Sequence, residues 1–392
     1  MKIAYVTTYD ALDVSQWSGT GAYAAKSLRD AGGDLQFIGP LVSPPRENLL
    51  GVRLRERLYC RLLKDRFGAF QSGYEPAILR YYAAQVRERI GDSHSDVIFS
   101  PGTIPIAYLE TDLPVVFWSD ATFALMVDYY PGFSHLHPRT IRMGHAYERA
   151  ALENAALALY SSAWAARSAV RDYGADPSRV KVVPYGANID SKNTLSDVVR
   201  PLQSRPASAC RLLFIGQDWE RKGGPQAVRI AEDLRARGIK AELTVVGCTP
   251  PDTESLPESV RVLGFISKKT QDGRAMLNQL FAESHFFLLP TVADCTPIVF
   301  AEANSFGLPV ITTNVGGIPT MVRTGLNGIT LSPQAPPEDY GHVIADLFSD
   351  PIRYAALVQT SFLEYERRLN WSVAGGTVMR YLRALSASGH SP

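Results

Sequence analysis

Cysteine, long apolar runs and an excess of either charge are scarce in this sequence. The four cysteines (Cys60, Cys210, Cys248 and Cys295) show no C-x-x-C spacing, which predicts reduced thiols and excludes a disulfide framework or a zinc site. No apolar run reaches the roughly 18 residues of a membrane helix, and the start, MKIAYVTTYD, is a strand pattern without the cationic region of a signal peptide. A net charge of +1 gives no argument for a nucleic-acid partner. We expect a cytoplasmic protein.

The length and the changes in composition along the chain indicate its domains. A chain of 392 residues is long enough for two domains, each with its own core. We predict an N-terminal domain over 1-190 and a C-terminal domain over 210-365, followed by a helical segment over 366-392. The residues between the domains, 191-209 (SKNTLSDVVRPLQSRPASA), are polar and contain prolines, as a linker should.

A strand–loop–helix–strand pattern fills residues 287–317. Phe287 to Leu289 reads as the end of a buried strand, and 309–313 as a second strand. Between them, Thr296 and Pro297 read as the cap and first residue of a helix. The pattern predicts a βαβ unit, whose ligands bind at the carboxyl ends of the strands.

The predicted start of this helix suits a phosphate, because the N–H groups of Ile298 and Val299 and the helix dipole face the loop. Asp294 lies in the loop, and Glu302 lies in the helix. Carboxylates only accept hydrogen bonds, so a pair beside an anion site suits a hydroxyl-rich group such as a ribose or a hexose. An acidic loop residue and an exposed helical Glu would give the same pattern, and the pair alone leaves both interpretations open.

The second half of the chain starts with the same kind of unit. A strand over 211–215 is followed by the loop GQDWERKGG and by a helix from Pro225 that ends at Gly238. In the loop, Lys222 can reach a diphosphate as a point charge and Arg221 can bind one with its planar fork. An ordinary basic turn is the alternative.

The first half begins with a strand over 2–8 and the loop WSGTGAY. Glycines at 19 and 21 let a backbone approach a bound group before a helix, although a simple turn has the same composition. A later strand, 114–118, is followed directly by the polar and aromatic stretch 119–137. This position places Asp120 at the ligand edge of the sheet.

Residues 46–89 form a basic, helical segment. The segment contains ten Arg or Lys and five Asp or Glu, which gives it a net charge of +5. A basic helix with Leu and Tyr on its other face can lie on an anionic membrane, here the inner face, and it can equally be a solvated surface.

Taken together, these motifs resemble the retaining nucleotide-sugar glycosyltransferases of family four, also called glycosyl transferases group 1. That family has the two-domain GT-B fold and an E-x7-E motif, which reads here as Asp294-x7-Glu302 and is followed by GLPVITTNVGG. The turn PYGAN before the linker and the loop RKGG also resemble family motifs. The resemblance covers nearly the whole chain and is strongest from 211 to 330.

The resemblance implies an α/β, GT-B enzyme with two Rossmann-like domains. Its first domain would bind the acceptor, its second would bind the nucleotide sugar, and 366-392 would cross back to the first. Catalysis would be retaining and independent of metal or other cofactors, with UDP favoured over GDP as the donor nucleotide. Lys222, Asp294, Glu302 and Asp120 would be the catalytic residues. The donor-binding residues would be Ser18, Gly19, Thr20, Gly21, Gly216, Gln217, Arg221, Lys222, Phe265, Thr296, Pro297, Ile298, Val299 and Glu302.

Three positions depart from the family pattern. The first acid of the motif is Asp294, Gln217 stands where the family has an Arg, and Trp118-Ser119-Asp120 stands where it often has a His. Asp120 would position the acceptor, and capping of its own loop is the alternative. The acceptor would be a hydroxyl of a glycan, a glycolipid or another cell-surface precursor. Two other functions stay open, a sugar-nucleotide epimerase and a catalytically silent sugar-nucleotide-binding protein.

Overall fold

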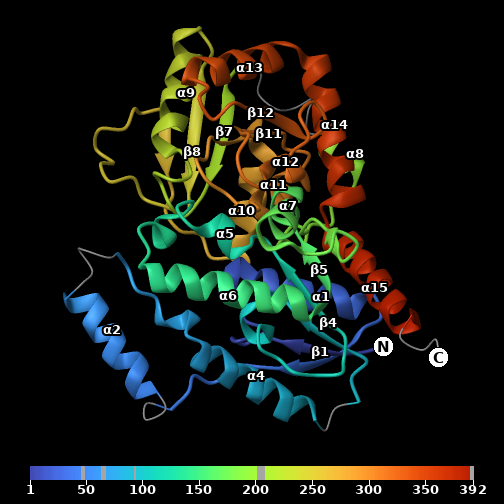
Figure 1. The fold of residues 1–392 in the computed structure, drawn as a ribbon. Helices are drawn as coiled ribbons and strands as arrows, with labels where there is room; N and C mark the ends of the chain where they lie inside the picture. Colours follow the sequence, from blue (N-terminus) through green and yellow to red (C-terminus); the bar gives the residue numbers. More distant parts are fainter. Residues whose placement is uncertain (46–48, 63–67, 92–93, 201–207, 389–392) are drawn as a thin grey trace. The chain divides into compact units, whose positions relative to one another are not determined.

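The structure is a computed structural model that describes residues 1–392 except 46–48, 63–67, 92–93, 201–207 and 389–392 (Figure 1). The chain divides into two compact units. The first unit comprises Met1–Pro184 and Ala374–Pro392, and the second comprises Tyr185–Val373. Each unit contains one six-stranded parallel sheet with helices, which confirms the predicted α/β class.

The sheet of the first unit has the strand order β2-β1-β3-β4-β5-β6. The predicted strands at 2–8 and 114–118 are confirmed as β1 and β4, with their ends shifted by a residue or two. The strand β2 was not predicted, because only alternate residues of DLQFI are covered at the edge of the sheet. The strand bounds are β1 Lys2–Val6, β2 Asp34–Ile38, β3 Val97–Ser100, β4 Val115–Ser119, β5 Ala155–Tyr160 and β6 Val180–Val182.

Helices connect these strands and cover the sheet. The helix α1 ends at Asp30, and Gly32, just beyond it, has a φ of +90° that a side chain would disfavour. The last helix, α15, begins in the second unit and continues into the first, where Gly375 lies against Ser27 of α1. The helix bounds are α1 Thr20–Asp30, α2 Leu50–Leu62, α4 Pro76–Ile90, α5 Phe123–Met126, α6 Pro138–Asn154, α7 Ala163–Tyr173 and α15 Trp371–Ser388.

The sheet of the second unit has the order β12-β11-β10-β7-β8-β9. Its central strands are fully buried, as expected for a parallel sheet covered on both faces. The last strand, β12, was not predicted, since GITL is too short to show a clear pattern. The strand bounds are β7 Cys210–Ile215, β8 Ala241–Val246, β9 Val260–Val262, β10 Phe286–Leu289, β11 Val310–Thr313 and β12 Gly328–Leu331.

The helices of the second unit include one inside the stretch 191-209. This helix, α8, begins with a reciprocal capping pair of Thr194 and Asp197 and packs against α14. Residues 201–207 of the same stretch lie outside the described residues. The helix bounds are α8 Leu195–Val199, α9 Gly224–Ala236, α10 Gln271–Glu283, α11 Ile298–Asn304, α12 Ile318–Met321, α13 Pro337–Ser349 and α14 Pro351–Arg368.

Each sheet has one place where the direction of winding reverses. In the first unit the chain adds β2 on one side of β1 and continues with β3 on the other side. In the second unit it runs from β7 to β9 in one direction and from β10 to β12 in the other. The loops that follow β1 and β3, and those that follow β7 and β10, therefore diverge at these reversal points. Ligands of open parallel sheets bind in the crevices that such loops leave.

Candidate functional site

Hydrogen bonds join the loops that follow β7 and β10 in the second unit. The Arg221 carbonyl accepts from the Val292 N–H at 2.9 Å and from the Thr291 hydroxyl at 3.0 Å. In return, the Arg221 guanidinium donates to the Ala293 carbonyl at 2.9 Å. The two loops that carry the predicted basic and acidic residues therefore lie together at one edge of the sheet, where β7 and β10 end.

Lys222 and Asp294 form an ion pair at this edge. Their side chains are only 14% and 8% exposed, so the pair is largely shielded from water. Gly216, at the end of β7, makes room for the lysine, because a Cβ at Gly216 would lie 2.8 Å from Lys222 Cγ. The structure therefore brings together three of the predicted site residues.

Arg221 has a structural role in the same loop. Its guanidinium contacts Asp218 at 3.2 Å as well as the Ala293 carbonyl, and its side chain is 20% exposed. In this arrangement Arg221 holds the two loops together. Its contact with a diphosphate stays a prediction.

Gly223 sets the position of Lys222 through its backbone. Its φ is +79°, and a Cβ there would lie 2.0 Å from the Pro290 carbonyl oxygen. We expect Gly223→Ala to lower the unfolding free energy of the chain by about 2–4 kcal/mol, the sum of left-handed strain and a displaced loop.

Chemical denaturation measures this effect, and Gly238→Ala is the matched control. Gly238 has a similar φ of +84° with nothing within 4 Å of an added Cβ. Strain alone should then cost about 1 kcal/mol. Equal losses in the two variants would contradict the close contact with Pro290.

Glu302 lies in α11 with its side chain 3% exposed, and it forms an ion pair with Lys268. Lys268 follows β9 and is 43% exposed. Sequence reasoning missed Lys268, although KK at 268–269 lies only a few residues after the predicted donor-binding residue Phe265. Each of the two predicted acids of the motif is therefore paired with a lysine.

The start of α11 differs from the prediction by one residue. The helix begins at Ile298 and Pro297 is its N-cap, whereas Thr296 was predicted as the cap. The Thr296 hydroxyl donates to the Cys295 carbonyl at 2.7 Å. Phosphate binding by the N–H groups of Ile298 and Val299 stays a prediction.

Two further predicted donor contacts lie in loops of the second unit. Gln217 follows Gly216 after β7, and Phe265 follows β9 with 71% of its surface exposed. The contact of Gln217 and Phe265 with the donor stays a prediction.

In the first unit, residues 18–21 form a tight turn into α1. Ser18 has a φ of +55° and Gly19 a φ of +85°, so the backbone reverses there before the helix begins at Thr20. Gly21 lies in the first turn of α1 and allows close packing, since an added Cβ would be 2.3 Å from the Tyr9 hydroxyl oxygen. The contact of Ser18, Gly19, Thr20 and Gly21 with a diphosphate stays a prediction.

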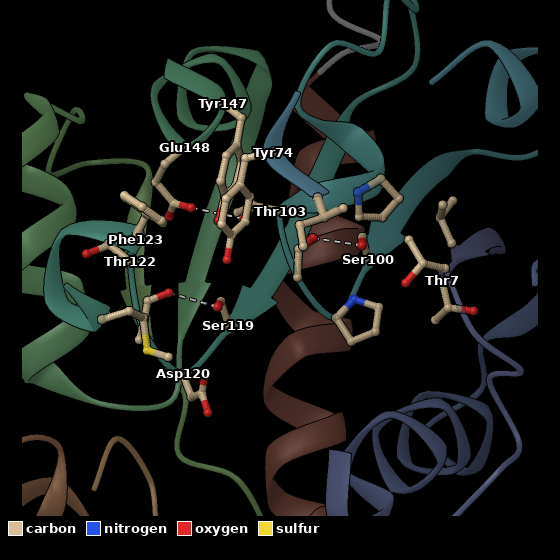
Figure 2. Close-up of a pocket in the computed structure, with 18 of the residues that line it drawn as sticks. Thr7, Tyr74, Ser100, Thr103, Ser119, Asp120, Thr122, Phe123, Tyr147 and Glu148 are labelled. Atoms are coloured by element: carbon tan, nitrogen blue, oxygen red, sulfur yellow. Dashed lines mark hydrogen bonds between the residues drawn. The ribbon is translucent and has the colours of Figure 1, made fainter. Parts of the chain in front are cut away.

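Asp120 lines a pocket of about 260 Å³ in the first unit (Figure 2). The walls come from the loops after β1, β3 and β4 and from α6. In Figure 2, Ser119 lies at the end of β4, Asp120 follows it, and the rings of Tyr74 and Tyr147 lie against each other. These two rings are stacked, with their centroids 5.2 Å apart. The pocket thus combines an aromatic wall with carboxylate and hydroxyl groups.

Glu148 is the residue of this pocket that sequence reasoning missed. It is 1% exposed, and its Oε2 accepts a hydrogen bond from the Thr103 hydroxyl at 3.0 Å. Tyr160 and the Phe123 amide lie close enough to favour the ionised carboxylate, but among the described residues no hydrogen bond of normal geometry reaches Oε1. The signal in the sequence was an acid on the apolar face of α6, between Tyr147 and Ala151.

Burial raises the pKa of Glu148 to about 7, an effect that the Thr103 hydroxyl opposes only in part. The ionisable groups that face it are Tyr74, Tyr147, Tyr160 and Tyr173, whose pKa values burial raises as well. Glu148 is therefore the group among them that titrates near neutral pH.

The unfolding free energy should depend on pH through Glu148. Between about pH 5 and pH 8 the unfolded chain ionises this residue while the folded chain keeps it neutral up to about pH 7. The wild type should accordingly lose up to about 3 kcal/mol of stability relative to Glu148→Gln over this interval. Denaturation of both proteins at pH 5 and pH 8 measures the difference, with the exposed Glu110→Gln as control. Parallel pH profiles would contradict the raised pKa.

Comparison with solved structures confirms the fold class. Sucrose-phosphate synthase from Thermosynechococcus elongatus matches with a TM-score of 0.69 at 16% identity and covers 99% of this chain and 100% of that one. Anabaena Alr3699/HepE, solved in complex with UDP-glucose, matches with a TM-score of 0.61 at 15% identity over 98% of this chain and 100% of that one. At such identities the likeness shows the fold alone, which is the GT-B fold with its two Rossmann-like domains.

Comparison of sequences confirms the family resemblance over the second half of the chain. The profile of glycosyl transferases group 1 matches residues 209–350. A D-inositol 3-phosphate glycosyltransferase from Rhodococcus opacus (strain B4) is 27% identical over 238 residues, which is 57% of this chain and 52% of that protein. The chain spans about half the length of the curated relatives it matches.

Proposed function

We propose that this protein is a retaining glycosyltransferase that moves a sugar from a nucleotide-diphosphate sugar to a hydroxyl acceptor. The proposal rests on one observation: Lys222 and Asp294 form an ion pair at the edge of the second sheet where the direction of winding reverses. The family match over 209–350 includes both residues. A largely shielded lysine beside an acid that can bind hydroxyls suits a sugar diphosphate.

The proposed chemistry uses the charges of this edge. The Lys222 ammonium stabilises the negative charge that develops on the leaving diphosphate, and each such preorganised group is typically worth ~2.7–4 kcal/mol of barrier. Asp294 and Glu302 accept hydrogen bonds from hydroxyls of the donor sugar. The acceptor hydroxyl attacks the anomeric carbon from the face that the diphosphate leaves, and a diphosphate oxygen takes its proton. The anomeric configuration is therefore retained, and the proposal includes no metal or cofactor.

UDP is the donor nucleotide that we propose first, with GDP second. UDP-glucose and UDP are bound in solved structures of Anabaena Alr3699/HepE, which shares the fold. For the acceptor, the names of the curated relatives point to an inositol phosphate. A hydroxyl on a glycan or glycolipid precursor is the wider class that we propose.

A thermal-shift panel with UDP, GDP, ADP and CMP, followed by mass spectrometry of transfer products, tests the function. A ligand at about 100 times its Kd should add ~2.7 kcal/mol of stability. We expect one nucleotide to stabilise the wild type, and its sugar derivative to give a transfer product. Conversion of the donor sugar without an acceptor would point to an epimerase. Binding without any turnover would point to a silent binding protein, an alternative that Gln217 and Asp294 motivate as departures from the family pattern.

We further propose that α2 touches an anionic membrane at the inner face. Leu50, Leu54 and Leu58 are 71%, 71% and 43% exposed at helical spacing, and the exposed Arg53 and Arg57 flank them. Residues 46–48 and 63–67 of the basic segment 46–89 lie outside the described residues, and none of the described helices is long and apolar enough to cross a bilayer.

Co-sedimentation with vesicles tests this contact. Vesicles that contain phosphatidylserine should retain the wild type and release Leu54→Asp, whereas vesicles of phosphatidylcholine alone should retain neither. Equal binding of wild type and variant would overturn the membrane proposal and leave the transferase proposal untouched.

A further inference from the structure

Lys268 lies at the edge of the second sheet where β7 ends, because hydrogen bonds join the ends of β7, β8 and β9. The Gly216 N–H, just after β7, donates to the Val246 carbonyl of β8 at 3.0 Å. The Gly247 N–H, just after β8, donates to the Gly264 carbonyl at 2.8 Å. Gly264 and Lys268 belong to the same loop, which follows β9. The loop that carries Lys268 is therefore part of the proposed donor edge.

The Lys268 ammonium is only partly used by the protein. It donates to Glu302 Oε1, and an ammonium has three N–H donors, so this contact leaves two of them for a ligand. The Lys268 side chain is 43% exposed, against 14% for Lys222 and 20% for Arg221. Of these three cations, Lys268 is the one that a bound molecule reaches most easily.

The ion pairs of Lys222 and Lys268 involve the two ends of one short segment. Asp294, the partner of Lys222, precedes α11, and Glu302, the partner of Lys268, lies one turn inside that helix. The loop 294–297 and one helical turn, which rises about 5.4 Å, separate the two acids. A molecule as long as a nucleotide sugar can therefore contact both pairs.

Charge defines the part of such a donor that Lys268 suits. Glu302 is 3% exposed, so its carboxylate needs a cation close by even when it accepts hydrogen bonds from hydroxyls of the donor. The multiple charge of a nucleotide sugar resides on its diphosphate. An ammonium with two remaining donors can bridge the Glu302 carboxylate and a phosphate oxygen, and it stays beside the acid while it does so.

We infer that Lys268 is a donor-binding residue, whose ammonium holds Glu302 and binds the diphosphate of the sugar nucleotide together with Lys222. The inference rests on the proposed function for the identity of the ligand. It adds to the donor site a lysine that lies outside the RKGG loop and outside the Asp294-x7-Glu302 motif. The diphosphate thereby meets two ammonium groups, one from the loop after β7 and one from the loop after β9.

Affinities of the full chain for UDP and for uridine, measured by saturation-transfer NMR, test this contact. Lys268→Gln should weaken UDP binding about tenfold or more, because a charged hydrogen bond to a phosphate is lost. Uridine has no phosphate, so its affinity should stay within about twofold. Lys268→Arg keeps the charge and should bind UDP within about threefold of the wild type. Lys269→Gln removes the neighbouring charge and is the matched control, which should bind both probes like the wild type.

A second pair of variants separates this contact from a structural role of Lys268. Lys268→Gln alone leaves the buried Glu302 carboxylate without its lysine, whereas the double variant Glu302→Gln/Lys268→Gln contains neither charge. The double variant should still bind UDP about tenfold more weakly than Glu302→Gln alone. Equal affinities of these two proteins for UDP would overturn the inference, and so would equal losses of UDP and uridine binding in Lys268→Gln.

Failure of the donor proposal is distinguishable from failure of this inference. Loss of UDP binding in Lys222→Ala together with full UDP binding in Lys268→Gln would leave the proposed transferase intact and remove Lys268 from its donor site. If the wild type binds GDP and not UDP, GDP and guanosine are the matched probes. A wild type that binds neither nucleotide would overturn both proposals.

Discussion

Lys222→Ala should lower kcat for sugar transfer about 10²- to 10³-fold. The variant removes the ammonium that stabilises the leaving diphosphate, and one preorganised charge-stabilising group is typically worth ~2.7–4 kcal/mol. Because the effect arises in the transition state, kcat and kcat/KM should fall together. Initial rates of nucleotide release and product formation with the cognate pair measure both constants.

Lys240→Ala is the matched control for this prediction. Lys240 belongs to the same unit but precedes β8, and its side chain is 65% exposed in a contact with Glu242. Its loss should leave kcat within about twofold, as a surface ion pair contributes little. Lys222→Met retains the aliphatic stem over Gly216 and separates loss of charge from loss of packing. Full activity in Lys222→Met would contradict the proposed role of the Lys222 ammonium in stabilising the leaving diphosphate.

Glu302→Gln should lower kcat/KM by about 10- to 100-fold, the range expected when a charged hydrogen-bond acceptor for a donor-sugar hydroxyl becomes neutral. The side chain is 3% exposed in α11, so the amide retains the shape while Lys268 loses its partner. Lys268 is 43% exposed and can regain water, which keeps the cost in folding stability small.

A double-mutant cycle with Lys268→Ala separates the two roles of Glu302. If Lys268 serves mainly to hold the carboxylate, the double variant should be no slower than Glu302→Gln alone. Glu283→Gln, a half-exposed acid at the end of α10, controls for the change in charge. An additive loss in the double variant would show that Lys268 contacts the donor independently of Glu302.

The repeating units of the fold were predictable because their signals are local. Glycines, prolines and apolar runs indicated β7, α9, β10 and β11 to within a residue or two. Loops at the carboxyl ends of parallel strands share one edge of the sheet. The sequence therefore also predicted that Lys222 and Asp294 lie in ligand-binding loops at such an edge. Their pairing across 72 residues depends on the neighbouring positions of β7 and β10, which no local pattern reports.

The elements missed by sequence reasoning were short or lay at an edge. The strands β2 and β12 end their sheets, and α8 is a five-residue helix inside a polar stretch that resembles a linker. Lys268 and Glu148 look like ordinary surface residues in the sequence. Only packing shows that Lys268 reaches Glu302, and that α6 turns Glu148 into a pocket beside Thr103.

The sequence by itself determined the α/β class, the positions of most strands and helices, and the residue types at the strand ends, because periodicity and capping act over a few residues. Tertiary structure alone decided which lysine neutralises which acid, and that a buried Glu148 shares a pocket with Asp120. The physical reason is that strand order and helix faces are set by the burial of apolar surface across the whole unit. Charges distant in the chain come into contact as a result of that packing.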